Sequence, residues 1–237
     1  MARVTTFNTR GKRKLAPCSY ITTMRHTYSI LIDGGYFTKI YSASQKSYPA
    51  DVDLIRVTDR IQATDDFKDK ELLRIYYYDA PPLQTKVVNP ISKAEINLGD
   101  SDLAKRARRL HAALSKAPDF ALRLGELKQN TWAVKHKVWP SGKAPSQASI
   151  ILGADDIKPD IKQKGVDLRI GMDIACMAIR KSVHSIVLVT GDSDMVPALK
   201  LARREGLRVY CVQMDTHHLT DELKIHSDRI ITVSSAQ

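Results

Sequence analysis

Short apolar runs alternate with amphipathic stretches along the last third of the chain, and this alternation restricts the fold more than any other feature. Runs with the length and composition of buried strands lie at 185–190, 207–213 and 229–233. Helical patterns lie before and between them, at 167–181, 193–205 and 219–227. Buried strands joined by helices predict a parallel sheet that is covered on both faces.

Two further strands are predicted nearer the N-terminus. Residues 28–33 form an apolar run that ends in an acid and the pair Gly34-Gly35, which is typical of a buried strand that meets a turn. A second run at 72–78 stops before a Pro-Pro pair. Helices are expected at 36–45 and at 101–116, the latter with Leu103 directed inward.

The middle of the chain departs from this pattern and is predicted to be an insertion. Residues 119–139 alternate in polarity and break at Gln129-Asn130, which predicts a hairpin. Residues 140–165 are rich in Ser, Gly, Pro and charge and are predicted to form a surface loop. We therefore expect one domain over residues 27–237, with an insertion at about 117–163, and a flexible basic arm over residues 1–26. An alternative is that the natural chain starts at Met24.

The charge balance favours a polyanionic partner. The formal net charge is +11, and Lys and Arg that neutralise phosphates release condensed counterions. The same excess is also consistent with solubility alone. None of the three cysteines is at CxxC spacing, which argues against a zinc site or a disulfide framework and fits a cytoplasmic setting. No apolar run approaches the roughly 20 residues of a membrane helix, so no membrane partner is expected.

Acidic residues gather where ligands bind in parallel sheets, beyond the carboxyl ends of the strands. Asp33 ends the first predicted strand, and Asp192 and Asp194 follow the strand at 185–190. Asp167 and Asp173 lie on the helix before that strand. Carboxylates brought together repel one another unless a cation lies between them, and hard oxygen ligands suit Mg²⁺ or Mn²⁺.

Each of these acids also has a purely structural interpretation. Asp33 can shape a turn, Asp167 and Asp192 can cap helices, and Asp194 can complement a helix dipole. Asp173 lies in an otherwise apolar stretch, where an unpaired acid that faces the sheet would be costly, although it can instead face solvent. The pattern alone therefore predicts a candidate acidic site but no reaction.

Three blocks of the sequence resemble the signature blocks of the NYN domain, and more narrowly of its LabA/DUF88-like branch, a relative of the PIN-domain ribonucleases. The blocks are Ile32-Asp33-Gly34-Gly35-Tyr36-Phe37, Lys164-Gly165-Val166-Asp167 with Asp173, and Thr190-Gly191-Asp192-Ser193-Asp194 with Pro197. The run 76–81 is also typical of that branch, and the resemblance covers about residues 27–234. One departure is Gly35, where many NYN proteins have Asn.

This resemblance implies a three-layer α/β/α sandwich around a central, mainly parallel sheet, with an inserted hairpin and loop. It also implies a metal-dependent endoribonuclease that hydrolyses phosphodiester bonds of single-stranded or structured RNA with Mg²⁺ or Mn²⁺ and leaves a 5′-phosphate. The catalytic and metal-binding acids implied are Asp33, Asp173, Asp192 and Asp194, with Asp167 as an outer member of the metal site. Candidates for substrate binding are Lys164, Arg169, Ser193, Lys105 and Arg109, each of which is also consistent with an ordinary solvated surface residue.

Other functions remain consistent with the same residues. One is a catalytically weak module that binds RNA or a protein and regulates it, and another is a metal-dependent DNA nuclease or phosphatase. A homo-oligomer or a regulatory protein partner also stays open. The sequence contains no GxGxxG, GxxxxGK[ST], HExxH or GxSxG motif, which argues against dinucleotide enzymes, P-loop NTPases, zincins and α/β-hydrolases. The pair His217-His218 is predicted to end a surface loop.

Overall fold

A parallel sheet of six strands lies at the centre of the computed structural model, which describes residues 26–138 and 151–235. The strand order is β10-β9-β8-β1-β2-β5. The strands are β1 (His26–Asp33), β2 (Lys70–Asp79), β5 (Phe120–Leu124), β8 (Ser185–Val189), β9 (Arg208–Met214) and β10 (Arg229–Val233). The predicted parallel α/β fold is therefore confirmed.

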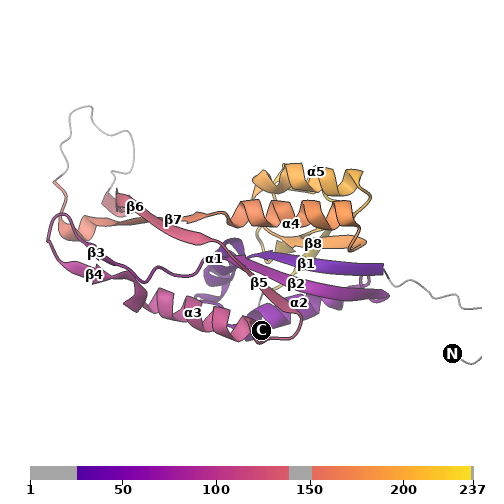
Figure 1. The fold of residues 1–237 in the computed structure, drawn as a ribbon, viewed down its shortest axis with the longest axis horizontal. Coiled ribbons are helices and arrows are strands. Elements are labelled where there is room, and N and C mark those ends of the chain that lie inside the picture. The colour runs from indigo at the N-terminus through magenta and orange to yellow at the C-terminus, as the bar shows by residue number, and fades with distance from the viewer. Residues whose placement is uncertain (1–25, 139–150, 236–237) are drawn as a thin grey trace, which may run out of the picture.

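Helices cover both faces of this sheet and make it the middle layer of an α/β/α sandwich (Figure 1). One face carries α1 (Gly34–Gln45), α2 (Asp51–Gln62) and α3 (Asp102–Leu114). The other carries α4 (Val166–Arg180), α5 (Val196–Arg204) and α6 (Asp221–Ile225).

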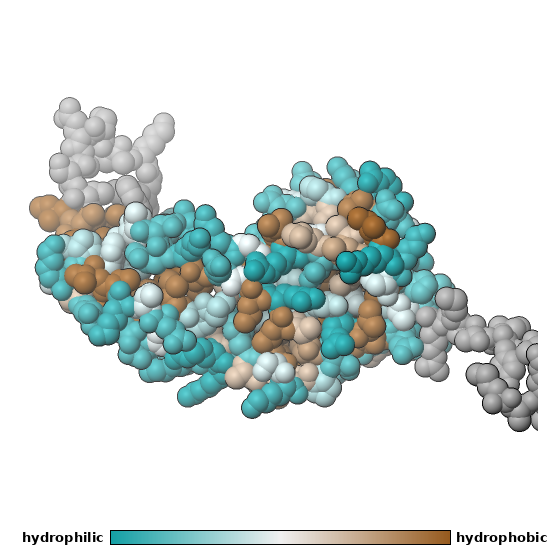
Figure 2. All heavy atoms as spheres, in the orientation of Figure 1, coloured by the Kyte–Doolittle hydropathy of each residue, from teal (hydrophilic) through white to brown (hydrophobic). Residues whose placement is uncertain are grey.

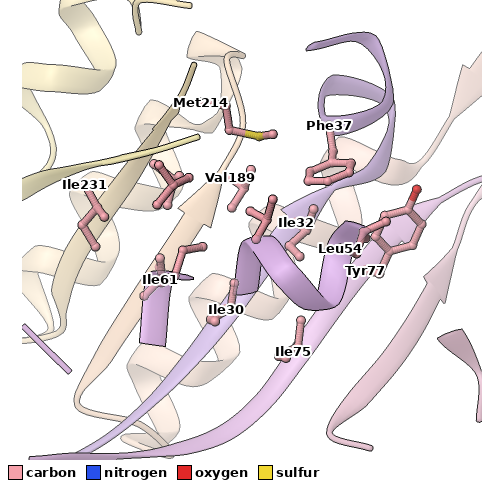
Figure 3. Close-up of a cluster of buried hydrophobic side chains, with 14 of the residues drawn as sticks. Ile30, Ile32, Phe37, Leu54, Ile61, Ile75, Tyr77, Val189, Met214 and Ile231 are labelled. Atoms are coloured by element: carbon pink, nitrogen blue, oxygen red, sulfur yellow. The ribbon is translucent and has the colours of Figure 1, made fainter. Parts of the chain in front are cut away.

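Two apolar clusters hold the three layers together. Ile30 and Ile32 of β1 pack into the cluster below α1 and α2, whereas Leu31 between them packs against α4 and α5. Figure 3 shows the first cluster, where β1, β2 and β8 meet α1 and α2. Successive side chains of a strand point to opposite faces, so a strand covered on both faces is apolar throughout. This accounts for the continuous apolar runs in the sequence.

Two antiparallel hairpins project from the sheet beside α3, and we call them together the arm (Figure 1). β6 (Glu126–Val134) pairs with β7 (Ile157–Lys164), and β3 (Lys86–Val88) pairs with β4 (Glu95–Asn97). Buried Asn89 joins the two hairpins, because its Nδ2 donates a hydrogen bond to the Ala154 carbonyl at 3.1 Å. Four 3-10 turns complete the described elements, at Leu98–Asp100, His136–Val138, Ala154–Asp156 and Ser193–Met195.

The predicted hairpin within 119–139 is wrong in its pairing. Its first half is β5, which joins the central sheet beside β2, and its second half is β6, which pairs with β7 about 30 positions further along. Gln129-Asn130 is an irregularity in the β6–β7 register and not a turn. The predicted loop at 140–165 is likewise wrong over 157–164, which forms β7. β7 consists mostly of exposed polar residues. Its sequence therefore shows little of the apolar pattern that predicts a strand.

Some features lie outside the predictions or cannot be compared with them. No element was predicted at residues 51–62, which form helix α2 and bury Leu54, Val57 and Ile61 at helical spacing. Leu103, expected inward, is 65% exposed. Residues 1–25 of the predicted flexible N-terminal segment and residues 139–150 of the predicted loop lie outside the described part of the chain. Within that part, no helix is both long and apolar enough to cross a membrane.

Candidate active site

The acidic residues meet where the strand order reverses. β1 and β8 are neighbours in the sheet, but the chain proceeds from β1 toward β2 on one side and from β8 toward β9 on the other. Such a switch point leaves a crevice beyond the carboxyl ends of the two strands. Asp33 is the last residue of β1, and Thr190, Gly191 and Asp192 directly follow β8. The topology therefore brings these segments together although about 160 positions separate them.

A hydroxyl group connects the two strand ends. Thr190 Oγ1 donates a hydrogen bond to Asp33 Oδ2 at 3.1 Å and accepts one from the Asp192 backbone N–H at 3.2 Å. The other carboxylate oxygen of Asp33 caps α1, because Oδ1 accepts a hydrogen bond from the Tyr36 N–H at 3.1 Å. Asp33 therefore caps α1 with one carboxylate oxygen and contacts the end of β8 with the other.

Two glycines are required by close packing around this crevice. A Cβ on Gly34 would lie 2.6 Å from the Tyr77 ring and 2.7 Å from the Tyr78 carbonyl oxygen. A Cβ on Gly191 would collide with the ring of Tyr36. Gly35 is different, because the nearest atoms to its Cβ position are Asp33 Oδ1 and Gln163 Oε1, both at 3.4 Å.

The remaining acids of the site come from two further segments. Asp192 caps the turn Ser193–Met195 that leads into α5, with its Oδ1 accepting from the Asp194 N–H at 2.9 Å. Asp194 is exposed in that turn, and Asp167 is exposed in the first turn of α4. Asp192 therefore acts as a cap and also lines the crevice, and Asp194 lies in the first turn, where an acid complements the helix dipole. The interpretation of Asp167 as a helix cap is not met, because Gly165 occupies the N-cap position of α4 and Asp167 lies in its first turn.

Like-charge repulsion links the four carboxyl groups. Burial raises the pKa of Asp33, the hydrogen bonds from Tyr36 and Thr190 oppose that rise, and the charge of Asp167 adds to it. The pKa of Asp167 is raised by partial desolvation and then by the charges of Asp192 and Asp194. A bound cation would relieve this repulsion, so the donor set suits a hard divalent ion.

The four acids do not form a closed cage in the described residues. No group of three or more His, Cys, Asp or Glu side chains there is close enough to hold one metal ion. Mg²⁺ is usually bound through only one or two carboxylates, with water and substrate phosphate as its other ligands. Asp33 and Asp192, which both line one cavity, provide that smaller set. The residues therefore fit a divalent ion that is held jointly with substrate.

That cavity of about 470 Å³ also contains residues that the sequence analysis did not select. Lys39 of α1 lines it together with His217 and His218 from the loop after β9. The two histidines were expected only to end a surface loop. Their position directly after a strand, at the same edge of the sheet as Asp33 and Asp192, is the signal that would have identified them.

Asp173 lies apart from the four acids in its interactions. Its Oδ2 accepts a hydrogen bond from the Tyr78 hydroxyl at 2.9 Å and lies 3.2 Å from Nε of Arg123 on β5. Burial first, and then the charge and hydrogen bond of Asp173, raise the pKa of Tyr78. The cost of an acid on this apolar helix is thus offset by two partners, and Asp173 does not line the cavity of Asp33 and Asp192.

None of the predicted substrate-binding residues lines the cavity of Asp33 and Asp192. Lys164 ends β7 just before α4, and Arg169 donates a hydrogen bond from Nη1 to the Gly165 carbonyl at 2.9 Å. Ser193 lies in the turn after Asp192. Lys105 and Arg109 are exposed on α3, and Arg109 lines a separate cavity of about 380 Å³.

Asp79 is a further acid at a strand end that the sequence analysis did not assign to a site. It ends β2, and its Oδ2 lies 2.8 Å from Nε2 of buried His111 on α3. Its Oδ1 accepts a hydrogen bond from the Ala80 N–H at 2.7 Å. Asp79 lines a third, more apolar cavity together with Gly34 and Gly35.

The parallel α/β/α sandwich with carboxylates at the switch in strand order is consistent with a PIN-like domain, a class whose members are generally nucleases. The chain belongs to the NYN domain family, whose model matches residues 28–234.

A solved structure of a protein of unknown function, VPA0982 from Vibrio parahaemolyticus, is similar in fold to this chain. It shares 16% sequence identity, with a TM-score of 0.49 over 88% of this chain and 93% of that chain. No curated protein matches the sequence.

Proposed function

We propose that this protein is a metal-dependent endoribonuclease of the NYN family. The observation that carries the proposal is the convergence of Asp33, Asp167, Asp192 and Asp194 at the switch point, where their charges act on one another. A surface that only binds polyanions has no use for clustered negative charge. The same cluster is useful when a divalent cation mediates between the protein and a phosphate.

The chain's own residues divide the work of such a site. Asp33 and Asp192 would hold Mg²⁺ or Mn²⁺ directly, and Asp167 and Asp194 would hold it through water. The ion supplies Lewis acidity toward the phosphate and lowers the pKa of a coordinated water. Thr190 keeps Asp33 oriented through its hydrogen bond. Lys39, His217 and His218 face the same cavity and can donate hydrogen bonds to phosphate oxygens.

Asp173 is left out of this proposed metal-binding set. Its carboxylate is held by Tyr78 and Arg123, and no interaction joins it to the other four acids within the described residues. We assign it instead to positioning Arg123 at the edge of the site. Of the five acids that the NYN resemblance implies for the metal site, the proposal thus keeps all but Asp173.

A second function has one observation in its favour. Because no three acidic or histidine side chains in the described residues are arranged for a single ion, a module that binds RNA and cuts it poorly is also supported. The fold and the basic charge of the chain are consistent with both functions. The two are distinguished by whether bound RNA is cleaved at a measurable rate.

The proposal is tested by cleavage of a labelled single-stranded RNA and of the DNA oligonucleotide of matching sequence. Wild type, Asp192→Asn and Asp65→Asn are compared in Mn²⁺, in Mg²⁺ and in chelator. Asp65 is a matched control because its side chain is 92% exposed and forms a surface ion pair with Lys68. We expect metal-dependent RNA cleavage by wild type and Asp65→Asn, and none by Asp192→Asn. Binding without cleavage by all three proteins would favour the regulatory module, and preferred cleavage of DNA would change the substrate.

A further inference from the structure

We propose that the apolar cavity between α1, α3 and the arm binds one unpaired nucleobase of the RNA. This inference rests on the proposed function and names a part of the substrate that the acidic residues do not contact. The cavity measures about 280 Å³ and shares Gly35 with the acidic cavity.

The walls of this pocket are aliphatic and come from separate elements. Leu98 precedes α3, Leu103 and Ala107 lie on it, and Leu127 and Ile161 come from the two strands of the β6–β7 hairpin. Leu103 is 65% exposed and Ile161 is 40% exposed, so solvent reaches large apolar side chains here. Figure 2 shows hydrophobic surface over the part of the molecule where α3 and the hairpins lie. A flat heteroaromatic ring would remove this surface from water.

The lining of the pocket also includes polar groups that can pair with the edge of a base. Asp79, Thr38 and Tyr48 all line the cavity and can accept or donate hydrogen bonds. Behind Gly34 lies the hydroxyl of Tyr77, which is fully buried and makes no hydrogen bond of good geometry within the described residues. Burial raises the pKa of the Tyr77 hydroxyl, and the nearby Thr38 side chain opposes that rise by a smaller amount. A mostly apolar cavity with a few polar groups is the usual form of a small-ligand site.

The pocket lies between the acids and a pair of cations. On one side Gly35 belongs to both the apolar and the acidic cavity. On the other side Tyr48 belongs both to the apolar cavity and to the cavity lined by Arg106 and Arg109. A single strand that runs from the acids to the arginines would place one base at the apolar pocket and the next phosphates at the arginines.

This geometry selects for an unpaired base. Base faces in a duplex are stacked on their neighbours, whereas bases of single strands and loops can turn out into a protein pocket. Apolar contact with the face of a base depends little on its identity. The arm would thus direct the nuclease toward single-stranded segments.

The test measures binding without cleavage. Asp192→Asn protein in chelator is titrated into a labelled single-stranded RNA and into a series in which one abasic residue is moved along the strand. The same titrations are made with Leu103→Asn/Ile161→Asn added, and with Ile179→Asn/Ile230→Asn as the matched control. The control residues are 65% and 42% exposed and do not line the pocket, so the two pairs carry a similar folding risk.

We expect the pocket variant to bind the intact RNA about tenfold more weakly, a difference of ~1.4 kcal/mol, while the control binds as before. We also expect one abasic position to weaken binding to the unmodified pocket by a similar factor, and to have little further effect in the pocket variant. Equal binding by pocket variant and control, or no position-specific abasic effect, would overturn the pocket. Neither readout depends on turnover, so a pocket-dependent binding result without metal-dependent cleavage would reject the nuclease and leave the pocket standing.

Discussion

Thr190 donates a hydrogen bond to Asp33 across the boundary between β8 and β1, at 3.1 Å between Oγ1 and Oδ2. Asp33 ends β1 and Thr190 directly follows the neighbouring β8, at the place where the strand order reverses. The contact therefore couples the geometry of the sheet to the orientation of a proposed metal ligand.

Replacement of Thr190 tests this coupling. Thr190→Val keeps the shape of the side chain but removes the hydroxyl that binds Asp33 and the Asp192 N–H. We expect the Mn²⁺ concentration for half-maximal cleavage to rise by about tenfold, because groups that orient metal ligands typically contribute on that scale. Thr190→Ser should restore most of the metal affinity. Unchanged metal dependence in Thr190→Val, beside a lowered unfolding temperature, would show a structural role only.

The division between Asp192 and Asp173 gives a second prediction. Asp173→Asn removes a partly exposed ion pair with Arg123, which contributes only about 0–1 kcal/mol to stability in typical cases. We expect its metal affinity, measured by calorimetric Mn²⁺ titration, to match wild type, whereas Asp192→Asn should lose it. If Asp173→Asn loses Mn²⁺ binding as completely as Asp192→Asn, Asp173 belongs to the metal site after all.

Lys39 is expected to contact the substrate and not the metal. Lys39→Ala removes a cation from the cavity of Asp33 and Asp192. The KM for RNA should rise, and the slope of log binding affinity against log salt concentration should become shallower by about 0.7, the value for one phosphate contact on a single strand. Lys200→Ala, on the exposed side of α5, serves as a control. An unchanged slope in Lys39→Ala would remove this residue from the interface.

Substitution of the two adjacent glycines at the start of α1 is predicted to affect stability unequally. Gly34→Ala would place a Cβ within 2.7 Å of the Tyr78 carbonyl oxygen, a backbone atom that cannot turn away. We expect a loss of about 1–3 kcal/mol in the free energy of unfolding, as for other overpacked sites. Gly35→Ala meets only ordinary contacts at 3.4 Å and should change stability by less than about 1 kcal/mol. Chemical denaturation of both variants checks the pair, and equal losses would contradict the packing argument.

The sequence predicted the central sheet better than the arm, for a physical reason. β8 and β9 are covered on both faces, and β10 at the sheet edge still buries Ile231 and Val233, so hydrophobicity marks these strands. β6 has no fully buried residue, β7 is largely exposed, and the two pair across a long segment, so no local pattern identifies the partner of either strand. Helix α2 did have a readable apolar spacing at Leu54, Val57 and Ile61.

The candidate site divides in the same way. Asp33 and Asp192 could be selected because each follows an apolar run, and parallel strands bring such positions to one edge. His217, His218 and Asp79 obey the same rule, but the predicted site took only the acids that follow the strands at 28–33 and 185–190 or lie on the helix before the latter. Where Asp173 points could not be predicted, because its partners Tyr78 and Arg123 come from two other strands.

The most direct test of the central claim is the chemistry of the ends that cleavage leaves. Single-stranded RNA is incubated with the protein in Mn²⁺, and the products are analysed by mass spectrometry. Attack by water activated at a metal site predicts a 5′-phosphate on one product and a free 3′-hydroxyl on the other, with no products in chelator or with Asp192→Asn. Products that carry a 2′,3′-cyclic phosphate, or cleavage that persists in chelator, would contradict the account.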